Sequence, residues 1–335
     1  MKKYESAYVL GKFMPFHLGH KYLIDTAAKL SKKVTVLVGS LPTEPIPGEL
    51  RYNWVKETYK DNKVVDVKWC NEVLPQYPEE NPEFWNIWVD VAKRYCPSDI
   101  DVIFTSELYG DPYAKHLGIK HHLVDLDRKK FSVSGTLSRN DPFGYWDYLP
   151  DVVKPYFVKR VVIMGPESTG KSTLSINLAK HYNTEFVEEY GRTVYEENGM
   201  HVDIDDFIKI SIGRQKIEDE KIKVANKILF CDTEDITTYY FSKEFYPNDY
   251  EKVEDFLLGE LNRKKNYDLY ILLKPDCEGV QDGTRSFLSE RERHYQIIKN
   301  LLIERGCEFV EIEGGWKERF DKSINVINNK ILKLC

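Results

Sequence analysis

Residues 165–172 constrain the fold of this chain more than any other segment. They read Gly-Pro-Glu-Ser-Thr-Gly-Lys-Ser and satisfy every fixed position of the pattern Gly-x-x-x-x-Gly-Lys-[Ser/Thr]. An apolar run at residues 160–164 precedes the pattern, and residues 171–182 follow it with helical spacing. A strand that turns into a helix in this way points several backbone N–H groups at one anion. The pattern therefore predicts an α/β unit that holds a nucleotide by its phosphates.

The residues of this loop have separate tasks in the predicted site. The backbone amides wrap the β- and γ-phosphates, Lys171 neutralises charge as it develops, and the Ser172 hydroxyl is a ligand of Mg²⁺. The expected ATP-binding residues of this half are Gly165, Glu167, Ser168, Thr169, Gly170, Lys171, Ser172 and Thr173. A glycine-rich turn that binds no nucleotide is the alternative interpretation.

An acidic residue at the end of a neighbouring strand completes such a site. Residues 228–231 are apolar and lead into Asp232, whose carboxylate can hold Mg²⁺ or accept a proton from an acceptor hydroxyl. The alternative is that Asp232 only caps the following helix. Glu188, Glu189 and Arg192 follow another short strand, and we expect them to bind the acceptor substrate.

A second group of charged residues is expected to form a lid over the transferred phosphate. Asp282 and Arg285 lie in a glycine-containing segment, and Arg291 follows six residues after Arg285. Such a segment can bring an arginine to the phosphate and exclude water. An ordinary turn is the alternative interpretation.

A second phosphate motif lies at residues 11–20, Gly-Lys-Phe-Met-Pro-Phe-His-Leu-Gly-His. His17 and His20 at the start of a helix can donate hydrogen bonds to an α-phosphate whose charge grows as it is attacked. Gly19 between them permits close approach of the backbone. Two buried core histidines are one alternative. Metal ligation is the other, but no third cysteine, histidine or acidic residue lies at a convincing spacing.

Strand and helix patterns alternate along both halves of the chain, which predicts two parallel sheets covered on both faces. Such sheets bind ligands beyond the carboxyl ends of their strands. Prolines 150 and 155 interrupt the pattern, and 335 residues suit two domains, which we place at residues 1–152 and 158–335. The expected strands are residues 7–11, 33–39, 64–69, 102–105, 121–126, 160–164, 186–187, 228–231, 269–273 and 308–312.

Composition excludes several classes of protein. A net charge of −6 argues against a general nucleic-acid binder, although the basic residues 128–130 are either a small-anion site or a solvated face. No apolar run approaches the ~20 residues needed to cross a bilayer, and the first residues lack a signal peptide pattern. The six cysteines show no Cys-x-x-Cys spacing. We therefore expect a cytoplasmic protein with free thiols and no membrane or DNA partner.

Several of these segments resemble one known family. Residues 11–20 resemble the first signature of nucleotidyltransferases, and residues 134–139 resemble the second, Ser-x-Thr-x-x-Arg, whose serine and arginine grip the triphosphate. Residues 105–110, 125–129 and 140–146 resemble the NadR-type enzymes. The resemblance covers nearly the whole chain, in the same domain order.

The resemblance implies a Rossmann-like nicotinamide mononucleotide adenylyltransferase followed by a P-loop ribosylnicotinamide kinase of α/β fold. Implied small-molecule partners are ATP, nicotinamide riboside, nicotinamide mononucleotide and NAD, with Mg²⁺ as cofactor. No helix-turn-helix precedes Met1, so the repressor role of some relatives is not expected. Ser138 stands where many relatives carry an aliphatic residue, and we expect it to face away from the phosphates.

Site residues follow from matching positions in these signatures. The resemblance implies that the ATP-binding residues of the first half are Gly11, Lys12, Phe13, His17, His20, Ser134, Thr136 and Arg139. Trp85 resembles the ring-stacking position for nicotinamide, and Arg51 is expected to contact a phosphate or the nicotinamide site. The residues expected to carry catalysis are His17, His20, Arg139, Lys171 and Asp232.

Two other functions remain open at this point. A fused pantetheine-phosphate adenylyltransferase and dephospho-coenzyme A kinase has the same reaction types in the same order, but Lys12, Phe13 and residues 105–110 match the nicotinamide family. A nucleotide-sensing regulator without turnover is the other, and intact His17 and Lys171 argue against it. Selectivity between nicotinamide and nicotinate substrates stays open, and so does a homo-oligomeric state.

Overall fold

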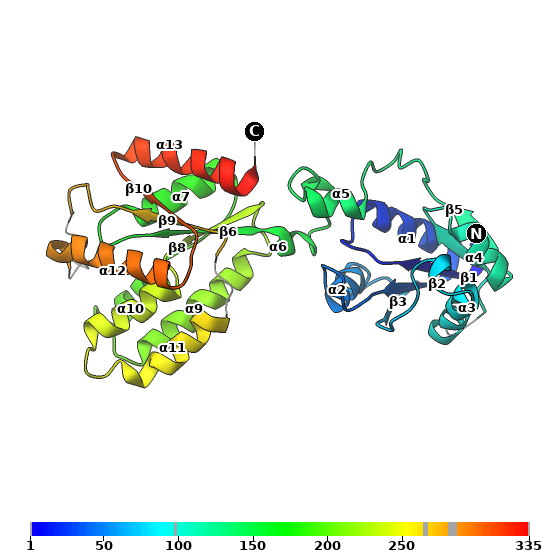
Figure 1. Ribbon diagram of the computed structural model, residues 1–335, viewed down its shortest axis with the longest axis horizontal. Coiled ribbons are helices and arrows are strands. Elements are labelled where there is room, and N and C mark those ends of the chain that lie inside the picture. The colour runs from blue at the N-terminus through cyan, green and yellow to red at the C-terminus, as the bar shows by residue number, and fades with distance from the viewer. Residues whose placement is uncertain (1, 97–98, 264–266, 281–286, 334–335) are drawn as a thin grey trace. The chain divides into compact units, whose positions relative to one another are not determined.

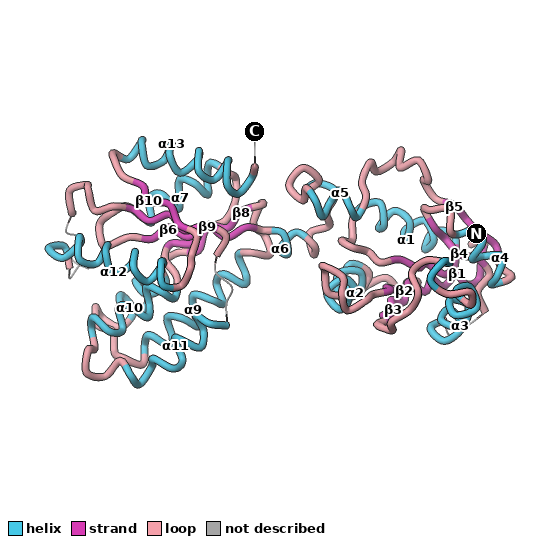
Figure 2. Tube along the Cα trace, viewed as in Figure 1, coloured by secondary structure: helices cyan, strands magenta, loops and turns pink. Residues whose placement is uncertain are grey.

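The computed structural model describes residues 2–96, 99–263, 267–280 and 287–333. Contacts between Cα atoms divide the chain into two compact units, Met1–Lys154 and Pro155–Cys335. Each unit contains one five-stranded, all-parallel sheet (Figure 1). In Figure 2, helices cover both faces of each sheet. The expected pair of α/β units is therefore confirmed.

The sheet of the N-terminal unit has the strand order β3-β2-β1-β4-β5. Its strands are β1 Tyr4–Gly11, β2 Ser31–Gly39, β3 Val65–Cys70, β4 Val102–Thr105 and β5 Lys120–Leu123. Its helices are α1 Leu18–Leu30, α2 Gly48–Thr58, α3 Phe84–Tyr95, α4 Gly110–Leu117 and α5 Gly135–Asn140, with 3-10 turns η1 Pro78–Glu80 and η2 Trp146–Tyr148. The strand order reverses between β1 and β4, so the end of β1 is where such a sheet binds its ligand.

The sheet of the C-terminal unit has the strand order β10-β9-β6-β8-β7. Its strands are β6 Lys159–Met164, β7 Phe186–Val187, β8 Ile228–Asp232, β9 Leu269–Leu273 and β10 Phe309–Ile312. Its helices are α7 Lys171–His181, α8 Tyr190–Glu197, α9 Asp206–Lys221, α10 Asp235–Phe245, α11 Glu251–Arg263, α12 Arg291–Glu304 and α13 Trp316–Ile327, with η3 Leu288–Glu290 and the π-turn η4 Asn328–Leu332. The short helix α6, Lys154–Phe157, lies at the sequence boundary of the two units.

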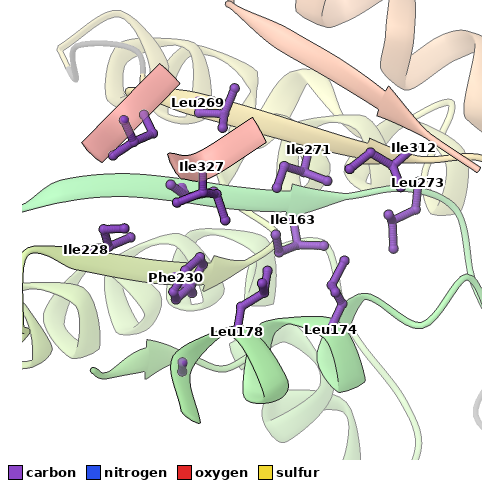
Figure 3. Close-up of a cluster of buried hydrophobic side chains, with 13 residues drawn as sticks. Ile163, Leu174, Leu178, Ile228, Phe230, Leu269, Ile271, Leu273, Ile312 and Ile327 are labelled. Carbon is purple, nitrogen blue, oxygen red and sulfur yellow. The ribbon is translucent and has the colours of Figure 1, made fainter. Parts of the chain in front are cut away.

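The core of the C-terminal unit fixes where its loops emerge. Figure 3 shows Ile163 of β6 and Phe230 of β8 packed with Leu178 of α7 and Ile327 of α13. These side chains are almost fully buried, and a buried aliphatic or aromatic side chain contributes about 1.5–3 kcal/mol to folding. In the β6–β8 ladder Ile163 lies opposite Asp232. The loop after β6 and the carboxylate of Asp232 therefore emerge at the same edge of the sheet.

The sequence predicts no helix at α4, α6 or α8. Helices α4 and α8 have eight residues each, and α4 contains Gly110 and Pro112 while α8 contains Gly191, residues that weaken a helical pattern. Tertiary packing stabilises α4, because Tyr113 and Ala114 are buried in the core. The last α-helix ends at Ile327 and passes into the π-turn η4. No helix among the described residues combines the length and apolar character that crossing a bilayer requires.

Candidate active sites

The first site is built where β1 leads into α1. His17 is the N-cap residue of α1, and its Nδ1 accepts a hydrogen bond from the backbone N–H of His20 at 3.3 Å. The imidazole rings of His17 and His20 stack with their centroids 3.7 Å apart. Phe13 precedes them in the left-handed backbone region (φ 48°) with its side chain buried. The two histidines thus lie together at a helix N-terminus, which favours an anion.

The second signature meets the first, although the two are far apart in the sequence. Arg139 Nη1 donates a hydrogen bond to the carbonyl oxygen of Met14. Gly135 lies so close to the same carbonyl that a Cβ there would be 2.6 Å from the oxygen. Arg139 Nη2 also donates to Thr136 Oγ1, 3.3 Å away. The segment at residues 134–139 therefore lies against the segment at residues 11–20.

The serines of α5 have capping and structural contacts. Ser134 is the N-cap residue, and its Oγ accepts from the backbone N–H of Leu137 at 3.2 Å. Ser138 is fully buried and donates its hydroxyl to the carbonyl oxygen of Ser134 at 2.9 Å. Ser138 has no accessible surface to offer a phosphate.

The histidine pair is uncharged at neutral pH. Burial lowers the pKa of His17 to about 3, with the Arg128 guanidinium as the second cause. Burial also lowers the pKa of His20 well below its usual value, assisted by His17 and Arg128. A neutral imidazole keeps one N–H donor and carries no charge. Arg128, whose surroundings the sequence left open, adds positive charge beside this pair.

We expect the imidazole of His17 to stay neutral in the nucleotide-free chain down to mildly acidic pH. Since its pKa is about 3, the Cε1–H resonance of His17 should not shift between about pH 8 and about pH 5 in an NMR titration. In the urea-unfolded chain the same resonance should titrate near 6.5. An inflection near 6.5 in the folded chain would contradict the lowered pKa of His17.

Two neighbouring residues differ from their expected roles. Arg51 was expected to contact a ligand, but its side chain is fully buried and Nη1 donates to the carbonyl oxygen of Lys12 at 2.7 Å. A second bond joins Arg51 to the Glu44 carboxylate, which also lies 2.9 Å from Lys12 Nζ. Arg51 has no accessible surface, so the expectation that it contacts a ligand is corrected. Its guanidinium instead stabilises the backbone of the segment at residues 11–20, at Lys12.

Trp85 is half-buried on α3, and one face of its ring is already covered. The ring stacks on His116 with centroids 5.2 Å apart and an interplanar angle of 14°. Trp88, on the same helix, is buried and donates its indole N–H to the carbonyl oxygen of Pro75 at 3.0 Å. Trp88 is therefore a core residue, and stacking of nicotinamide on Trp85 stays a prediction.

The second site lies between β6 and α7. Gly170 has φ 82°, and a Cβ there would lie 2.0 Å from the ring of Trp316, so only glycine suits the turn into α7. Lys171 Nζ donates to the carbonyl oxygen of Pro166 at 3.1 Å, and Thr169 Oγ1 donates to the same oxygen at 2.9 Å. These contacts fold residues 165–172 into a closed turn around the lysine.

Asp232 lies at the end of β8 beside this turn and is 2% exposed. Burial raises the pKa of Asp232 to about 7, with the Glu189 carboxylate as the next cause, while Lys171 and Ser172 act in the opposite direction. Its Oδ1 has no hydrogen-bond partner among the described residues. The N-cap of α10 is Glu234, not Asp232. The helix-cap interpretation of Asp232 is therefore wrong, and its carboxylate has an unused ligand position.

The residues present fit a magnesium ion bound mainly by a nucleotide. The described residues contain no group of three or more histidine, cysteine or acidic side chains able to hold a metal. Mg²⁺ is usually held by one or two protein oxygens together with substrate phosphates and waters. The Ser172 hydroxyl and the Asp232 carboxylate supply that number. The same finding leaves the metal-site interpretation of His17 and His20 without support in the described part of the chain.

A cavity of about 320 Å³ is lined by the phosphate loop at residues 165–172 and by the helices α8, α9 and α10. Glu189 and Arg192 line it, whereas Glu188 is exposed outside it. Its aromatic lining was missed by the sequence analysis and comes from α8, α9 and α10. These residues are Tyr190, Tyr195, Phe207, Phe241 and Phe245. Phosphate-binding groups at one end and aromatic rings at the other suit a ligand with a planar ring.

The predicted lid is only partly within the described residues. Asp282 and Arg285 lie outside them. Arg291, at the start of α12, donates Nη1 to the carbonyl oxygen of Cys277 at 2.8 Å and Nη2 to that of Ser168 at 3.3 Å. In this structure Arg291 binds a backbone carbonyl oxygen of the phosphate loop, that of Ser168.

The fold and the two sites define a chain with a nucleotidyltransferase-type unit and a P-loop unit. Two family descriptions match the same units, "Citrate lyase ligase C-terminal domain" over residues 6–128 and "AAA domain" over residues 160–319. The trifunctional NAD biosynthesis/regulator protein NadR of Escherichia coli is 34% identical over 95% of this chain and 82% of its own length. The NadR protein of Salmonella typhimurium matches equally, at 34% identity. The chain belongs to the NadR family.

Solved structures show the same fold. A NadR protein in complex with NAD and AMP-PNP has a TM-score of 0.82 at 23% identity and covers 100% of this chain and 98% of its own. A NadR protein in complex with NR has a TM-score of 0.83, also at 23% identity, and covers 98% of this chain and 97% of its own. The resemblance stated from the signatures is therefore confirmed across both units.

Proposed function

We propose that this chain makes NAD from nicotinamide riboside in two steps. The C-terminal unit transfers the γ-phosphate of ATP to the 5′-hydroxyl of nicotinamide riboside, which gives nicotinamide mononucleotide. The N-terminal unit then joins that phosphate to the α-phosphate of a second ATP and releases pyrophosphate. The observation that supports this best is that one chain of the NadR family keeps both phosphate sites with their charged groups in place. Residues 1–152 are assigned to the second step and residues 158–335 to the first.

The kinase step depends on Lys171 and Asp232. Lys171 would neutralise charge on the transferred phosphate, and the loop amides would bind oxygens of the β- and γ-phosphates. Asp232, whose pKa burial raises to about 7, is suited to accept the proton of the 5′-hydroxyl. Mg²⁺, held by Ser172 and Asp232, would supply charge neutralisation between the phosphates. Glu189, Arg192 and the aromatic end of the cavity would hold the nucleoside.

The adenylyl step needs no covalent intermediate. The phosphate of nicotinamide mononucleotide is itself the nucleophile, so the protein supplies position and charge stabilisation. His17 and His20 donate neutral N–H groups to the α-phosphate, and Arg139 and Lys12 face the rest of the triphosphate. Arg128 adds a positive charge that acts on the same pair of histidines.

Replacing Asp232 by asparagine should keep the shape of the kinase site and remove its charge. Kinase turnover should fall by at least ~10²-fold, the usual size of a general-base contribution, while ATP still binds through the loop. Adenylyl transfer in the same sample is the internal control and should not change. If Asp232→Asn is active and Glu189→Gln is dead, the acidic role belongs to Glu189. Glu188→Gln is the matched control, since Glu188 is exposed outside the cavity.

A choice of acceptors separates this function from its nearest rival. Nicotinamide mononucleotide and 4′-phosphopantetheine each present a phosphate to the N-terminal unit. We expect pyrophosphate release from ATP with nicotinamide mononucleotide and none with 4′-phosphopantetheine. The reverse result would assign the chain to coenzyme A synthesis, and ATP binding without pyrophosphate release would support a regulator without turnover.

A further inference from the structure

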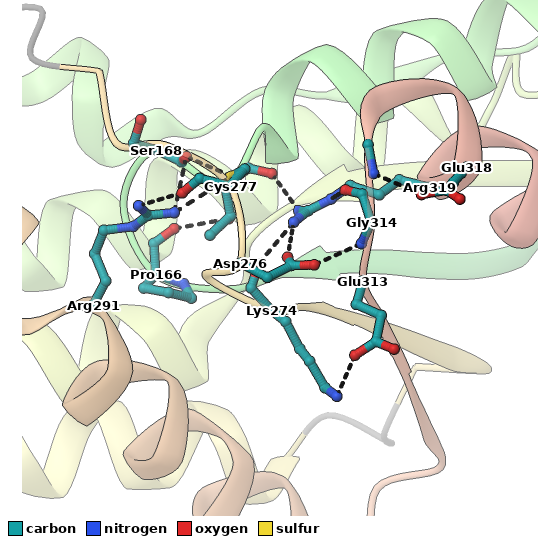
Figure 4. A network of polar contacts seen from close by, with 12 residues as sticks. Pro166, Ser168, Lys274, Asp276, Cys277, Arg291, Glu313, Gly314, Glu318 and Arg319 are labelled. Carbon is teal, nitrogen blue, oxygen red and sulfur yellow. Dashed lines mark hydrogen bonds and ion pairs between the residues drawn. The ribbon is translucent and has the colours of Figure 1, made fainter.

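Two arginines donate hydrogen bonds to backbone carbonyl oxygens of the phosphate loop at residues 165–172 (Figure 4). Arg319 of α13 donates Nη1 to the carbonyl oxygen of Thr169 at 2.9 Å. Arg291 of α12 donates Nη2 to the carbonyl oxygen of Ser168 at 3.3 Å. The two carbonyls belong to consecutive peptide groups of the loop. No motif in the sequence points to either contact.

Arg319 is held at this position by several other groups. Its side chain is 2% exposed, Nε donates to the carbonyl oxygen of Gly314 at 2.7 Å, and Nη2 donates to that of Lys274 at 2.9 Å. Nη2 also pairs with the Asp276 carboxylate. One guanidinium thus connects the loop, the end of β9 and the segment before α13. A planar group with five fixed N–H donors can do this, and a lysine ammonium cannot.

Arg291 approaches from the other side of the loop. Its Nη1 donates to the carbonyl oxygen of Cys277 at 2.8 Å, which fixes the guanidinium beside Ser168. Ser168 itself has φ 57°, a left-handed conformation that costs a non-glycine residue free energy unless surrounding groups hold it. The backbone N–H of Val280 donates to Ser168 Oγ at 2.8 Å and restrains the same residue. Ser168 is therefore held at both its side chain and its carbonyl.

The geometry of the peptide bond connects these contacts to phosphate binding. In a trans peptide the C=O and N–H groups point in opposite directions. The carbonyl of Ser168 shares a peptide group with the N–H of Thr169, and the carbonyl of Thr169 shares one with the N–H of Gly170. A guanidinium on each carbonyl oxygen thus turns the two N–H groups toward the phosphate side. Charge-assisted hydrogen bonds at one end of a peptide group also polarise the donor at its other end.

We propose that Arg291 and Arg319 are positioning residues that hold and polarise the Thr169 and Gly170 amides for the β-phosphate of the nucleotide. Neither guanidinium needs to touch the nucleotide, because each acts through a carbonyl oxygen of the loop. The inference rests on the proposed kinase function, since it requires that the loop binds a nucleotide phosphate. It also gives Arg291 a role different from that of a lid arginine.

The test is an NMR titration of the ¹⁵N-labelled full chain with ADP and Mg²⁺, followed at the Gly170 amide. That resonance reports binding at this loop only, even if ADP also enters the N-terminal unit. We expect Arg291→Gln and Arg319→Lys each to weaken ADP binding by at least ~10-fold, the loss of about one charge-assisted hydrogen bond. Arg291→Lys, which keeps the charge without the fork, should recover part of that loss. The Thr169 and Gly170 amide protons should move upfield in the free variants, a change that simple loss of stability does not produce.

The matched control is Arg293→Gln. Arg293 lies on the same helix as Arg291 but is exposed and pairs with the carboxylates of Glu244 and Glu290. Its ADP affinity should stay within ~2-fold of the original chain. If Arg319→Lys does not fold, the two Arg291 variants decide alone. ADP affinity unchanged in the arginine variants would overturn the inference, whereas no Gly170 response to ADP in the original chain would overturn the kinase function itself.

Discussion

Replacing Lys171 by alanine should abolish phosphorylation of nicotinamide riboside and leave NAD synthesis from supplied nicotinamide mononucleotide nearly intact. Lys171 starts α7, its Nζ lies 3.1 Å from the Pro166 carbonyl, and its charge acts on the buried Asp232. No other lysine belongs to residues 165–172. Removing one preorganised donor to developing charge costs ~10²- to 10³-fold, and a full positive charge at the transferred phosphate should cost at least the upper value.

Rates of both reactions in one preparation of the Lys171→Ala chain provide the measurement. Lys180→Ala is the matched control, because Lys180 lies on the same helix but is exposed at its far end. The control should keep both activities. Loss of both activities in a folded Lys171→Ala chain would mean that the two units do not work independently.

His20→Ala should give the opposite pattern. His20 stacks on His17 at the N-terminus of α1 and is neutral, so it contributes a hydrogen bond rather than a charge. Losing a donor that strengthens only as the α-phosphate is attacked should lower kcat for adenylyl transfer by ~10²- to 10³-fold, about 3–4 kcal/mol, with little change in KM. Kinase turnover should be unchanged.

His20→Asn separates the donor role from packing. The asparagine side chain is shorter but keeps an N–H donor, so it should retain more activity than alanine. The measurement is the initial rate of pyrophosphate release with nicotinamide mononucleotide and ATP. A His20→Ala rate within a few-fold of the original would show that the histidine pair is structural.

Much of the fold could be predicted because its signals are local. Apolar runs marked β6 and β8, and the pattern at residues 165–172 required a strand before it and a helix after it. The meeting of Met14 with Arg139 is different, because the two lie far apart in sequence and only the resemblance to a known family implied it. The short helices α4 and α8 depend on tertiary packing. They contain glycine or proline, which have low helix propensity, so the local sequence does not predict a helix there.

The parts of the sites that the sequence did not predict depend on three-dimensional packing. Phe207 and Phe241 have the spacing of ordinary core residues, and only the fold turns them into a cavity wall. Arg51 follows a turn as a ligand-binding arginine would, yet its guanidinium is buried against the carbonyl of Lys12. Arg291 and Arg319 act on backbone carbonyls, which leave no pattern of side chains to recognise.

The most direct test of the whole account is a single incubation of the purified chain with nicotinamide riboside, ATP and Mg²⁺. Nicotinamide mononucleotide and NAD are separated and measured over time, together with ADP and pyrophosphate. We predict that nicotinamide mononucleotide forms first, that NAD follows, and that each NAD is accompanied by one ADP and one pyrophosphate. Consumption of ATP without NAD, or no reaction with either nicotinamide substrate, would contradict the proposal that this chain carries both steps.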